Sequence, residues 1–235
     1  MRTLPIFSLS CRDCSLAELC LPRALDTEEL EQLESKVKQH PVLARGALLY
    51  NLREPFHSLY VVKSGTLKTV INTASGEEQI TGFFMPGEIV GFDGLDTGHT
   101  CSAVAIERTT VCDLPLAAMD DLTGAIPSLR REIFRLMSRE ITTDQSMLLT
   151  LARRTSEERI ATFLMNLSER FRKRGFSAVQ FPLAMARQDI GNYLGMAAET
   201  VSRVLTNLSD ANLISVHGRV LTVLNPTSLA LRAGQ

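Results

Sequence analysis

A helical pattern that contains neither glycine nor proline runs from just after Pro127 to about Thr150, and it limits the possible folds more than any other feature. Apolar residues recur along it at the period of an α-helix. A helix of this length is typical of a coiled coil. We therefore expect one long helix that divides the chain into two different parts.

The part before this helix has the pattern of an antiparallel β-domain. Between Leu43 and Leu114, short segments rich in Val, Ile, Thr, Phe and Tyr alternate with turns that carry glycine. This spacing predicts a β-sandwich or barrel. A helix over Leu25–Val37, capped by Asp26 or Thr27, is expected ahead of it. The best candidate strands are Ser58–Lys63, Gly65–Asn72 and Gln79–Phe84.

The part after the long helix is expected to hold shorter helices and one late pair of strands. A helix opens at Ser156 and runs through Phe171. Two strands, Leu213–Val216 and Val220–Leu224, flank His217-Gly218-Arg219 as in a β-hairpin. The fold class is therefore α+β. We expect a cysteine-rich segment at residues 1–24, the β-domain at 25–126, the long helix at 127–154 and a smaller domain at 155–235.

Composition and charge restrict where the protein works and what it binds. The chain has 235 residues, 45% of them hydrophobic, enough for a substantial core. No run of about 18 apolar residues is present, and Met1–Leu25 lacks the apolar stretch of a secretory signal, so we expect a cytoplasmic protein. Residues 153–235 hold 11 Lys and Arg against 6 Asp and Glu, a net charge of +5, while the rest carries −6. Only the C-terminal part suits nucleic-acid phosphates.

Six residues of the long helix follow one another at steps of four and three and so lie on one narrow seam. A seam of this kind usually pairs with a second copy of itself, which predicts a homodimer. In an alternative arrangement the helix packs on its own β-domain, with Leu129, Leu136 and Ile141 in that core. Both can hold, since the two stripes are different faces. The seam residues are Ile133, Met137, Glu140, Asp144, Met147 and Leu151.

Arg187–Leu208 has the pattern of two short helices that cross at a tight turn, a helix-turn-helix. Gly191 allows the helices to approach, and Gly195 can adopt the left-handed conformation of the turn. We expect Ile190, Leu194, Val201 and Val204 or Leu205 on the inside.

The polar side chains of the second helix would then face outward, where a recognition helix contacts base edges in the major groove. Arg203 can bond guanine, and Glu199 can accept a hydrogen bond from cytosine. An ordinary helical hairpin with a solvated face is the alternative. The basic domain, the hairpin at His217–Arg219 and the dimer seam favour DNA binding. The candidate DNA-binding residues are Glu199, Thr200, Ser202 and Arg203.

Three of the five cysteines, Cys11, Cys14 and Cys20, lie within ten residues. In a reducing compartment, clustered thiols bind metal or sense redox changes more often than they form disulfides. A fourth ligand would have to come from Cys101 or Cys112. The uneven spacing favours an iron-sulfur cluster modestly over zinc.

Taken together, these segments resemble the FNR branch of the CRP/FNR family of transcription regulators, and the likeness extends from Cys11 to Val223. The protein also looks like the Anr-type anaerobic regulators of that branch. The stretches that carry the resemblance are Cys11–Pro22, Glu78–Phe83, Val111–Pro115, Arg135–Ile141, Asp189–Gly195 and Glu199–Arg203.

The resemblance implies a jelly-roll β-roll like that of cyclic-nucleotide-binding domains, a dimerisation helix and a C-terminal winged helix-turn-helix. It also implies an oxygen-sensing [4Fe-4S] cluster that is held when oxygen is scarce. The cluster would promote dimerisation and binding to a palindrome of TTGAT-like half-sites, and so control anaerobic and respiratory genes. Its ligands would be Cys11, Cys14, Cys20 and Cys112, whereas Cys101 has no counterpart.

The resemblance assigns base reading to Glu199, Ser202 and Arg203. It also makes an exposed turn that contains Thr73, Gly76 and Glu77 a candidate contact for RNA polymerase, although a plain solvated hairpin is nearly as good an interpretation.

Members of the family that bind cyclic nucleotides carry an arginine just before a Ser/Thr-Ala pair, and this chain departs from that pattern. Here Thr100-Cys101 precedes Ser102-Ala103, so cyclic AMP is not expected as the ligand, although Gly87–Gly91 keeps the outline of the cassette. The loop at His99–Ser102 is also shorter than in the family, and the turn at Met196–Ala198 differs in detail.

Two other functions compete with this one. In the first, a metal-storage or redox enzyme, the cysteines would perform chemistry, but the four histidines are scattered and no catalytic arrangement is present. The chain is therefore not expected to be an enzyme. In the second, a DNA-binding regulator would use a structural zinc site or a thiol-disulfide switch in place of the cluster.

Overall fold

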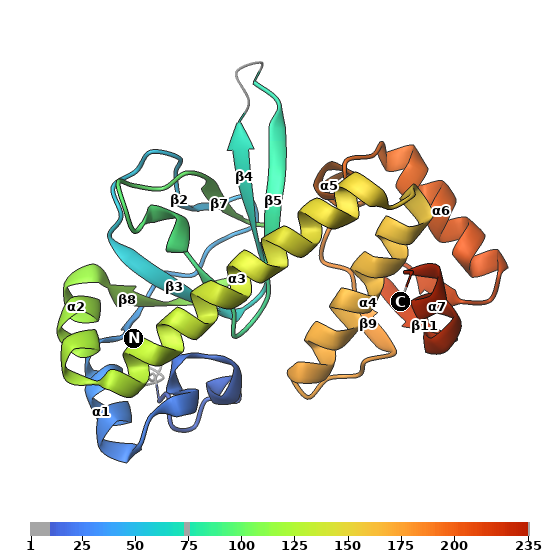
Figure 1. Ribbon diagram of the computed structural model, residues 1–235. Helices are drawn as coiled ribbons and strands as arrows, with labels where there is room; N and C mark the ends of the chain where they lie inside the picture. The colour runs from blue at the N-terminus through green and yellow to red at the C-terminus, as the bar shows by residue number, and fades with distance from the viewer. Residues whose placement is uncertain (1–9, 73–75, 235) are drawn as a thin grey trace, which may run out of the picture. The chain divides into compact units, whose positions relative to one another are not determined.

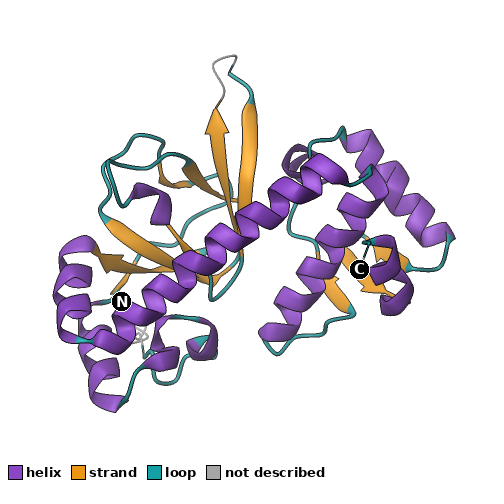
Figure 2. Ribbon diagram, in the orientation of Figure 1, coloured by secondary structure: helices purple, strands orange, loops and turns teal. Residues whose placement is uncertain are grey.

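The structure is a computed structural model that describes residues 10–72 and 76–234. The chain divides into two compact units, each described by itself below. The first comprises Met1–Lys68 and Phe83–Ser138, and the second comprises Thr69–Gly82 and Arg139–Gln235. Helices and strands occur together throughout (Figures 1 and 2), so the predicted α+β class is confirmed. No helix within residues 10–72 and 76–234 is long and apolar enough to span a membrane.

Two four-stranded sheets form the β-roll, with strand orders β1-β8-β3-β6 and β2-β7-β4-β5. The three candidate strands are confirmed as β3, β4 and β5 to within two residues at each end. The β-strands of the roll are β1 (Lys38–Gln39), β2 (Leu48–Tyr50), β3 (Ser58–Ser64), β4 (Leu67–Asn72), β5 (Glu78–Phe84), β6 (Ile89–Val90), β7 (Ser102–Ala105) and β8 (Thr110–Pro115).

Strand β3 is buried on both faces because it separates two clusters of the core. Leu59 and Val61 pack with the helices of the first unit, whereas Tyr60 and Val62 pack with residues of the other sheet. This alternation is the two-residue period of a strand. It explains why the segment reads as a continuous apolar run rather than as alternating polar and apolar residues.

Three helices of the first unit lie beside β3 and β8 (Figure 1). Helix α1 (Thr27–Lys36) begins at the expected cap, since the Glu29 N–H donates to Asp26 Oδ1 over 2.9 Å. Helix α2 (Leu116–Ala125) follows β8 directly, and α3 (Pro127–Arg153) is the expected long helix. The Ser128 hydroxyl donates to Glu29 Oε1 at 2.6 Å, which ties α3 to α1.

The position of α3 on the β-domain agrees in part with the alternative arrangement. Leu129 is fully buried and Leu136 is partly buried in the core of the first unit. Three residues differ from their sequence-based assignments. Ile133 and Met137, expected on the dimer seam, pack in this core, whereas Ile141, expected in the core, is 57% exposed. The helix therefore faces its own domain through two of the three predicted residues, together with Ile133 and Met137.

The second unit contains the short helices and the late strands. The predicted hairpin is confirmed, and three of its four strand bounds, at Leu213, Val216 and Leu224, differ by one residue from those expected. A third strand, not predicted, completes the sheet order β10-β11-β9. The elements are α4 (Ser156–Lys173), β9 (Gln180–Pro182), α5 (Arg187–Leu194), α6 (Ala198–Asp210), β10 (Ile214–His217), β11 (Val220–Val223) and α7 (Pro226–Arg232).

One arginine ties three segments of this unit together. The Arg159 guanidinium donates to the carbonyl oxygens of Leu151 at 2.7 Å and Leu194 at 2.9 Å. These carbonyls lie at the ends of α3 and α5, where the helices leave such groups without partners of their own. The Arg159 side chain therefore fixes the last turn of α3 to the helix-turn-helix.

Candidate functional site

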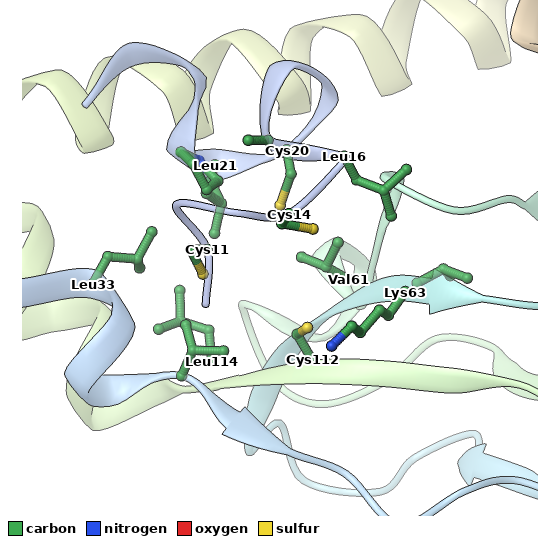
Figure 3. Close-up of a pocket in the computed structure, with 14 residues that line it drawn as sticks. Cys11, Cys14, Leu16, Cys20, Leu21, Leu33, Val61, Lys63, Cys112 and Leu114 are labelled. Carbon is green, nitrogen blue, oxygen red and sulfur yellow. The ribbon is translucent and has the colours of Figure 1, made fainter. Parts of the chain in front are cut away.

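Four of the five cysteines line one cavity in the first unit (Figure 3). Its volume is about 500 Å³ with the open mouth included. Apart from the thiols and Lys63, the lining side chains are apolar, among them Leu16, Leu33 and Leu114. The cysteines of the cavity are Cys11, Cys14, Cys20 and Cys112.

Short turns bring the three N-terminal cysteines to the cavity. The Cys14 N–H donates to the Cys11 carbonyl, and the chain continues through two 3-10 turns, Ala17–Leu19 and Leu21–Ala24. The segment lies close against the β-roll at Gly87, where an added Cβ would stand 2.9 Å from Leu19 Cβ. A side chain larger than hydrogen at position 87 would therefore push the cysteine segment away.

The structure distinguishes the two candidates for the fourth ligand. Cys112 lies on β8, directly opposite Val61 of β3, and its side chain faces the cavity (Figure 3). Cys101 is buried elsewhere, and its thiol donates to Asp93 Oδ2 at 3.3 Å. The fold thus brings Cys112 to the N-terminal cysteines and leaves Cys101 apart from them.

The cavity disfavours free thiolates. Burial, with a smaller contribution from the neighbouring Cys112, raises the pKa of Cys11 to about 11. Burial is also the main cause of the raised pKa of Cys20 and of Cys112. Lys63 acts in the opposite direction on Cys11 and Cys112. Near neutral pH these thiols keep their protons, so a metal would have to displace them on binding.

The type and number of these side chains fit a thiolate-bound metal group. Zinc and iron-sulfur clusters are both held by four cysteines, while magnesium and calcium prefer oxygen ligands. Within residues 10–72 and 76–234, however, no three His, Cys, Asp or Glu side chains are already grouped as metal ligands.

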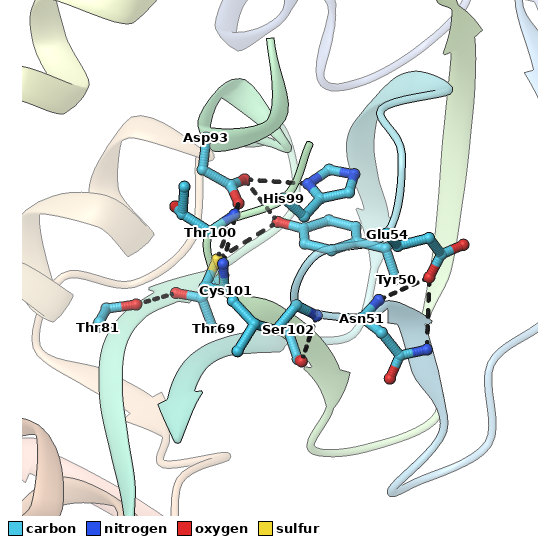
Figure 4. Close-up of polar contacts among 11 residues, drawn as sticks. Tyr50, Asn51, Glu54, Thr69, Thr81, Asp93, His99, Thr100, Cys101 and Ser102 are labelled. Atoms are coloured by element: carbon cyan, nitrogen blue, oxygen red, sulfur yellow. Dashed lines mark hydrogen bonds and ion pairs between the residues drawn. The ribbon is translucent and has the colours of Figure 1, made fainter. Parts of the chain in front are cut away.

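The segment around Cys101 forms a closed polar network (Figure 4). The Asp93 carboxylate accepts hydrogen bonds from the backbone N–H groups of Thr100 at 2.9 Å and Cys101 at 3.3 Å. It also accepts one from the Tyr50 hydroxyl at 3.1 Å, and Tyr50 stacks on His99 with 3.6 Å between ring centroids. The chain just before Ser102 is thus turned toward an internal anion.

The helix-turn-helix is formed by α5 and α6, as the sequence predicts. Gly195 has a φ of 63°, the left-handed conformation expected at this turn. A Cβ on Gly191 would lie 2.6 Å from the Met196 carbonyl oxygen, so the close approach requires glycine. The expected inner residues are buried, and both Val204 and Leu205 are among them.

The outward face of α6 carries the predicted DNA-binding residues. Glu199, Ser202 and Arg203 are exposed, and Thr200 is half-buried. The Arg203 guanidinium is 3.4 Å from Thr200 Oγ1, so the two side chains lie together near the start of the helix. No side chain caps the N-terminus of α6, which leaves its first N–H groups suited to phosphate oxygens.

The hairpin of β10 and β11 follows α6 directly. Its turn has Gly218 at a φ of 60°, and Arg219 is exposed beside it. In Figure 1 these elements lie with α6 in the second unit. An exposed arginine at such a turn can contact phosphate oxygens of the DNA backbone.

Three exposed apolar residues of α3 form a face that was not predicted from the sequence. Phe134, Ile141 and Leu148 are each more than half exposed and recur every seven residues. Three residues of the predicted seam fall at the intervening heptad positions, three residues after each of these: Met137, Asp144 and Leu151. Met137 is partly buried against the core of the first unit. We call Phe134, Ile141 and Leu148 the heptad face.

The candidate polymerase contact is only partly described. Thr73 lies outside the described residues, whereas Gly76 and Glu77 are exposed. Gly76 has a φ of 82°, in the left-handed region that favours glycine.

Two family models match the chain. Residues 41–124 match the cyclic nucleotide-binding domain, and residues 158–232 match the Crp-like helix-turn-helix domain. Among solved structures, FixK2 from Bradyrhizobium japonicum has a TM-score of 0.77 and 28% sequence identity, over 83% of this chain and 96% of that chain. The predicted β-roll and helix-turn-helix are therefore confirmed.

Curated relatives match over almost the entire length. The transcriptional activator protein Anr of Pseudomonas aeruginosa is 51% identical over 100% of this chain and 96% of the relative. The fumarate and nitrate reduction regulatory protein of Escherichia coli is 43% identical over 97% of this chain and 91% of the relative. The fumarate nitrate reduction regulatory protein of Klebsiella oxytoca is 44% identical over 97% and 92%.

Proposed function

Because the chain belongs to the FNR branch of the CRP/FNR family of transcription regulators, we propose that it switches its DNA binding in response to oxygen through a [4Fe-4S] cluster. It is a DNA-binding regulator of transcription and not an enzyme. Its relatives are named for activation and for fumarate and nitrate reduction, which supports control of anaerobic and respiratory genes. A regulator of this kind works in the cytoplasm.

The observation that carries the proposal is the shared cavity of Cys11, Cys14, Cys20 and Cys112. We assign these four residues as the cluster ligands. When bound, the cluster supplies a redox-labile centre that oxygen destroys. The protein supplies four thiolates and an apolar lining that limits access of water, and cluster binding would order the N-terminal segment against β8.

The second part of the proposal is that the protein works as a homodimer through α3. Because Ile133 and Met137 pack in the core of their own domain, we propose the heptad face in place of Ile133, Met137, Glu140 and Met147, and keep Asp144 and Leu151 of the predicted seam. Exposed apolar residues at a heptad repeat favour pairing with an identical helix. A Leu148→Glu variant should then keep its iron but remain monomeric and lose affinity for DNA.

The third part concerns the DNA site and its readout. We assign base reading at a palindrome of TTGAT-type half-sites to Glu199, Thr200, Ser202 and Arg203, because these residues lie on the outward face of α6. The exposed Gly76 and Glu77 support the turn at residues 73–77 as a contact for RNA polymerase.

We further propose that cyclic AMP is not a ligand. The backbone N–H groups of Thr100 and Cys101, which precede Ser102, already donate to the Asp93 carboxylate. A cyclic phosphate would have to displace this internal anion without help from an arginine.

Anaerobic purification followed by visible absorption, iron and sulfide analysis, and DNA binding tests the proposal. We expect a brown protein with about four iron atoms per chain, which bleaches in air and then releases its DNA site. A protein that binds zinc would instead support a structural metal site, and one without metal a thiol switch. DNA binding that is equal with and without oxygen would refute oxygen sensing.

A further inference from the structure

We propose that Lys63 is a positioning residue of the four-cysteine site, whose ammonium group offsets the negative charge of the thiolate ligands and so strengthens metal binding. This inference rests on the proposed function, because it assumes that the four cysteines bind a metal group. Lys63 itself contacts no substrate or reacting atom in this role.

The backbone directs Lys63 to the cavity through a β-bulge. Val62 pairs with Val111 and Ser64 pairs with Thr110, so β3 has one more residue than β8 at this point, and that residue is Lys63. A bulge redirects the side chain of its extra residue. Figure 3 shows the Lys63 side chain extending along the wall of the cavity, with its nitrogen beside Cys112.

Lys63 lines the cavity together with its two preceding strand neighbours, Val62 and Val61, and Val61 lies opposite Cys112. The aliphatic stem of a lysine can lie on apolar surface while its charged end stays in water. Lys63 is exposed as a whole, which agrees with this arrangement.

Of the charged residues around the thiols, Lys63 is the one that can offset the negative charge of the thiolates. Among the described residues that line the cavity, Lys63 alone carries a positive charge. The negative group nearby is Glu34, whose Oε1 accepts the Cys11 N–H at 3.3 Å. Glu34 raises the pKa of Cys11, whereas Lys63 lowers the pKa of Cys11 and of Cys112.

The attraction between the Lys63 ammonium group and the thiolates should increase the affinity of the site for a metal. Four thiolates around a divalent cation leave a net negative charge in a cavity that is mostly apolar, and burial disfavours that charge. A cation beside Cys112 offsets part of it. Either lysine or arginine can provide the charge at this position, but a neutral side chain of similar length cannot.

The experiment titrates the reduced, metal-free full-length protein with Co²⁺ under anaerobic conditions and follows the thiolate-to-cobalt absorption. We expect Lys63→Met to weaken binding about tenfold, which corresponds to about 1.4 kcal/mol, and Lys63→Arg to restore it. Lys173→Met removes the same charge from an exposed position in the second unit and should bind as the unsubstituted protein does. Thermal unfolding checks that each variant is folded.

Ionic strength separates an effect of charge from an effect of packing. The difference between Lys63→Met and the unsubstituted protein should shrink from low salt to about 1 M salt, where screening acts over roughly 3 Å. Equal affinity of both proteins at low salt would overturn the proposal. A loss that Lys63→Arg fails to restore and that salt leaves unchanged would also overturn it. Absence of Co²⁺ binding by the unsubstituted protein would instead refute the metal site itself.

Discussion

At the scale of single residues, base reading by the outward face of α6 would depend on very few side chains. Arg203 is exposed, and within residues 10–72 and 76–234 its guanidinium makes a single long contact, with Thr200 of the same helix. The Arg203 guanidinium therefore contributes little to the stability of the fold. Such a side chain can be removed to test base reading without loss of stability.

We predict that Arg203→Ala lowers affinity for the palindrome about 10- to 100-fold, because a bidentate arginine-guanine contact contributes about 1–3 kcal/mol. Fluorescence anisotropy with the palindrome and with an unrelated duplex measures the effect, and the melting temperature should not change. Thr206→Ala, an exposed substitution farther along α6, serves as the control. An equal loss on both duplexes would mean that Arg203 contacts phosphate rather than a base.

The residues of the proposed metal site differ in how far sequence alone could identify them. Cys11, Cys14 and Cys20 are close in the chain, so their clustering was predictable. The residue pattern left Cys101 and Cys112 as alternatives, because the choice depends on the register of β3 with β8. Lys63 carried no signal at all, since a β-bulge is a property of two paired strands.

At the scale of elements, α3 has two different environments along its length. Its first turns contribute Leu129 and Ile133 to the core of the first unit, while Ile141 and Leu148 farther along are exposed. The helical period was clear from sequence, but the face in contact with the core was not, because both stripes are apolar. A shift of one residue in a helix rotates the face by about 100°.

We predict that Asp144→Ala dimerises and binds DNA in air. Asp144 occupies a heptad position of the proposed dimer face, where two copies would bring like charges together. Sedimentation velocity of the metal-free protein measures association, and Asp121→Ala, an exposed change on α2, is the control. A variant that stays monomeric in air would refute the repulsion.

The same carboxyl gives dimerisation a pH dependence. Desolvation raises the pKa of Asp144, so the folded chain favours the neutral carboxyl more than the unfolded chain does. That stabilisation is present below the unfolded pKa of about 3.9 and is lost as pH rises through the higher folded value. Burial in a dimer acts in the same direction. Lowering the pH should therefore strengthen association of the unsubstituted protein and not of Asp144→Ala.

We predict that two glycines of the helix-turn-helix differ in their tolerance of alanine. A Cβ at position 191 would overlap the Met196 carbonyl, and such overpacking typically costs 1–3 kcal/mol. At Gly195 the nearest atom to an added Cβ is 3.5 Å away, so the cost is only that of a left-handed alanine, about 1–2 kcal/mol. Urea denaturation should rank Gly191→Ala as the less stable variant. The reverse order would contradict this geometry.

Several elements escaped prediction for identifiable reasons. Helix α2 contains Gly124 and two adjacent aspartates, so its apolar pattern is weak. Strand β9 has three residues and ends in Pro182, and it exists only because β11 pairs with it. Helix α7 did have a signal, since Asn225 caps it and Pro226 occupies its first turn.

At the scale of the whole molecule, charge is divided unevenly along the chain. Residues 153–235 carry a net charge of +5, whereas the chain as a whole carries −1. Association with DNA should therefore depend on the C-terminal part alone. The remainder contributes a negative field that discourages contact between DNA and other surfaces.

We predict a steep dependence of DNA binding on salt. A dimer with 6–10 phosphate contacts should lose roughly 10³–10⁵ in affinity between 50 and 200 mM salt. Arg219→Ala, at the hairpin turn, should reduce the slope by about one per protomer and weaken all sequences alike. Measurement of affinity against salt for both proteins tests this. An unchanged slope would exclude Arg219 from the backbone contacts.

The proposed ligands Cys20 and Cys112 come from distant parts of the chain, and the segment between them is about 90 residues long. A metal group bound to both acts as a reversible cross-link that closes this long loop. Most of the β-roll lies inside the loop, so metal loading would lower the entropy of its unfolded state and raise its mechanical and proteolytic resistance. Oxygen would then remove a topological restraint from the β-roll at the same time as it removes the signal.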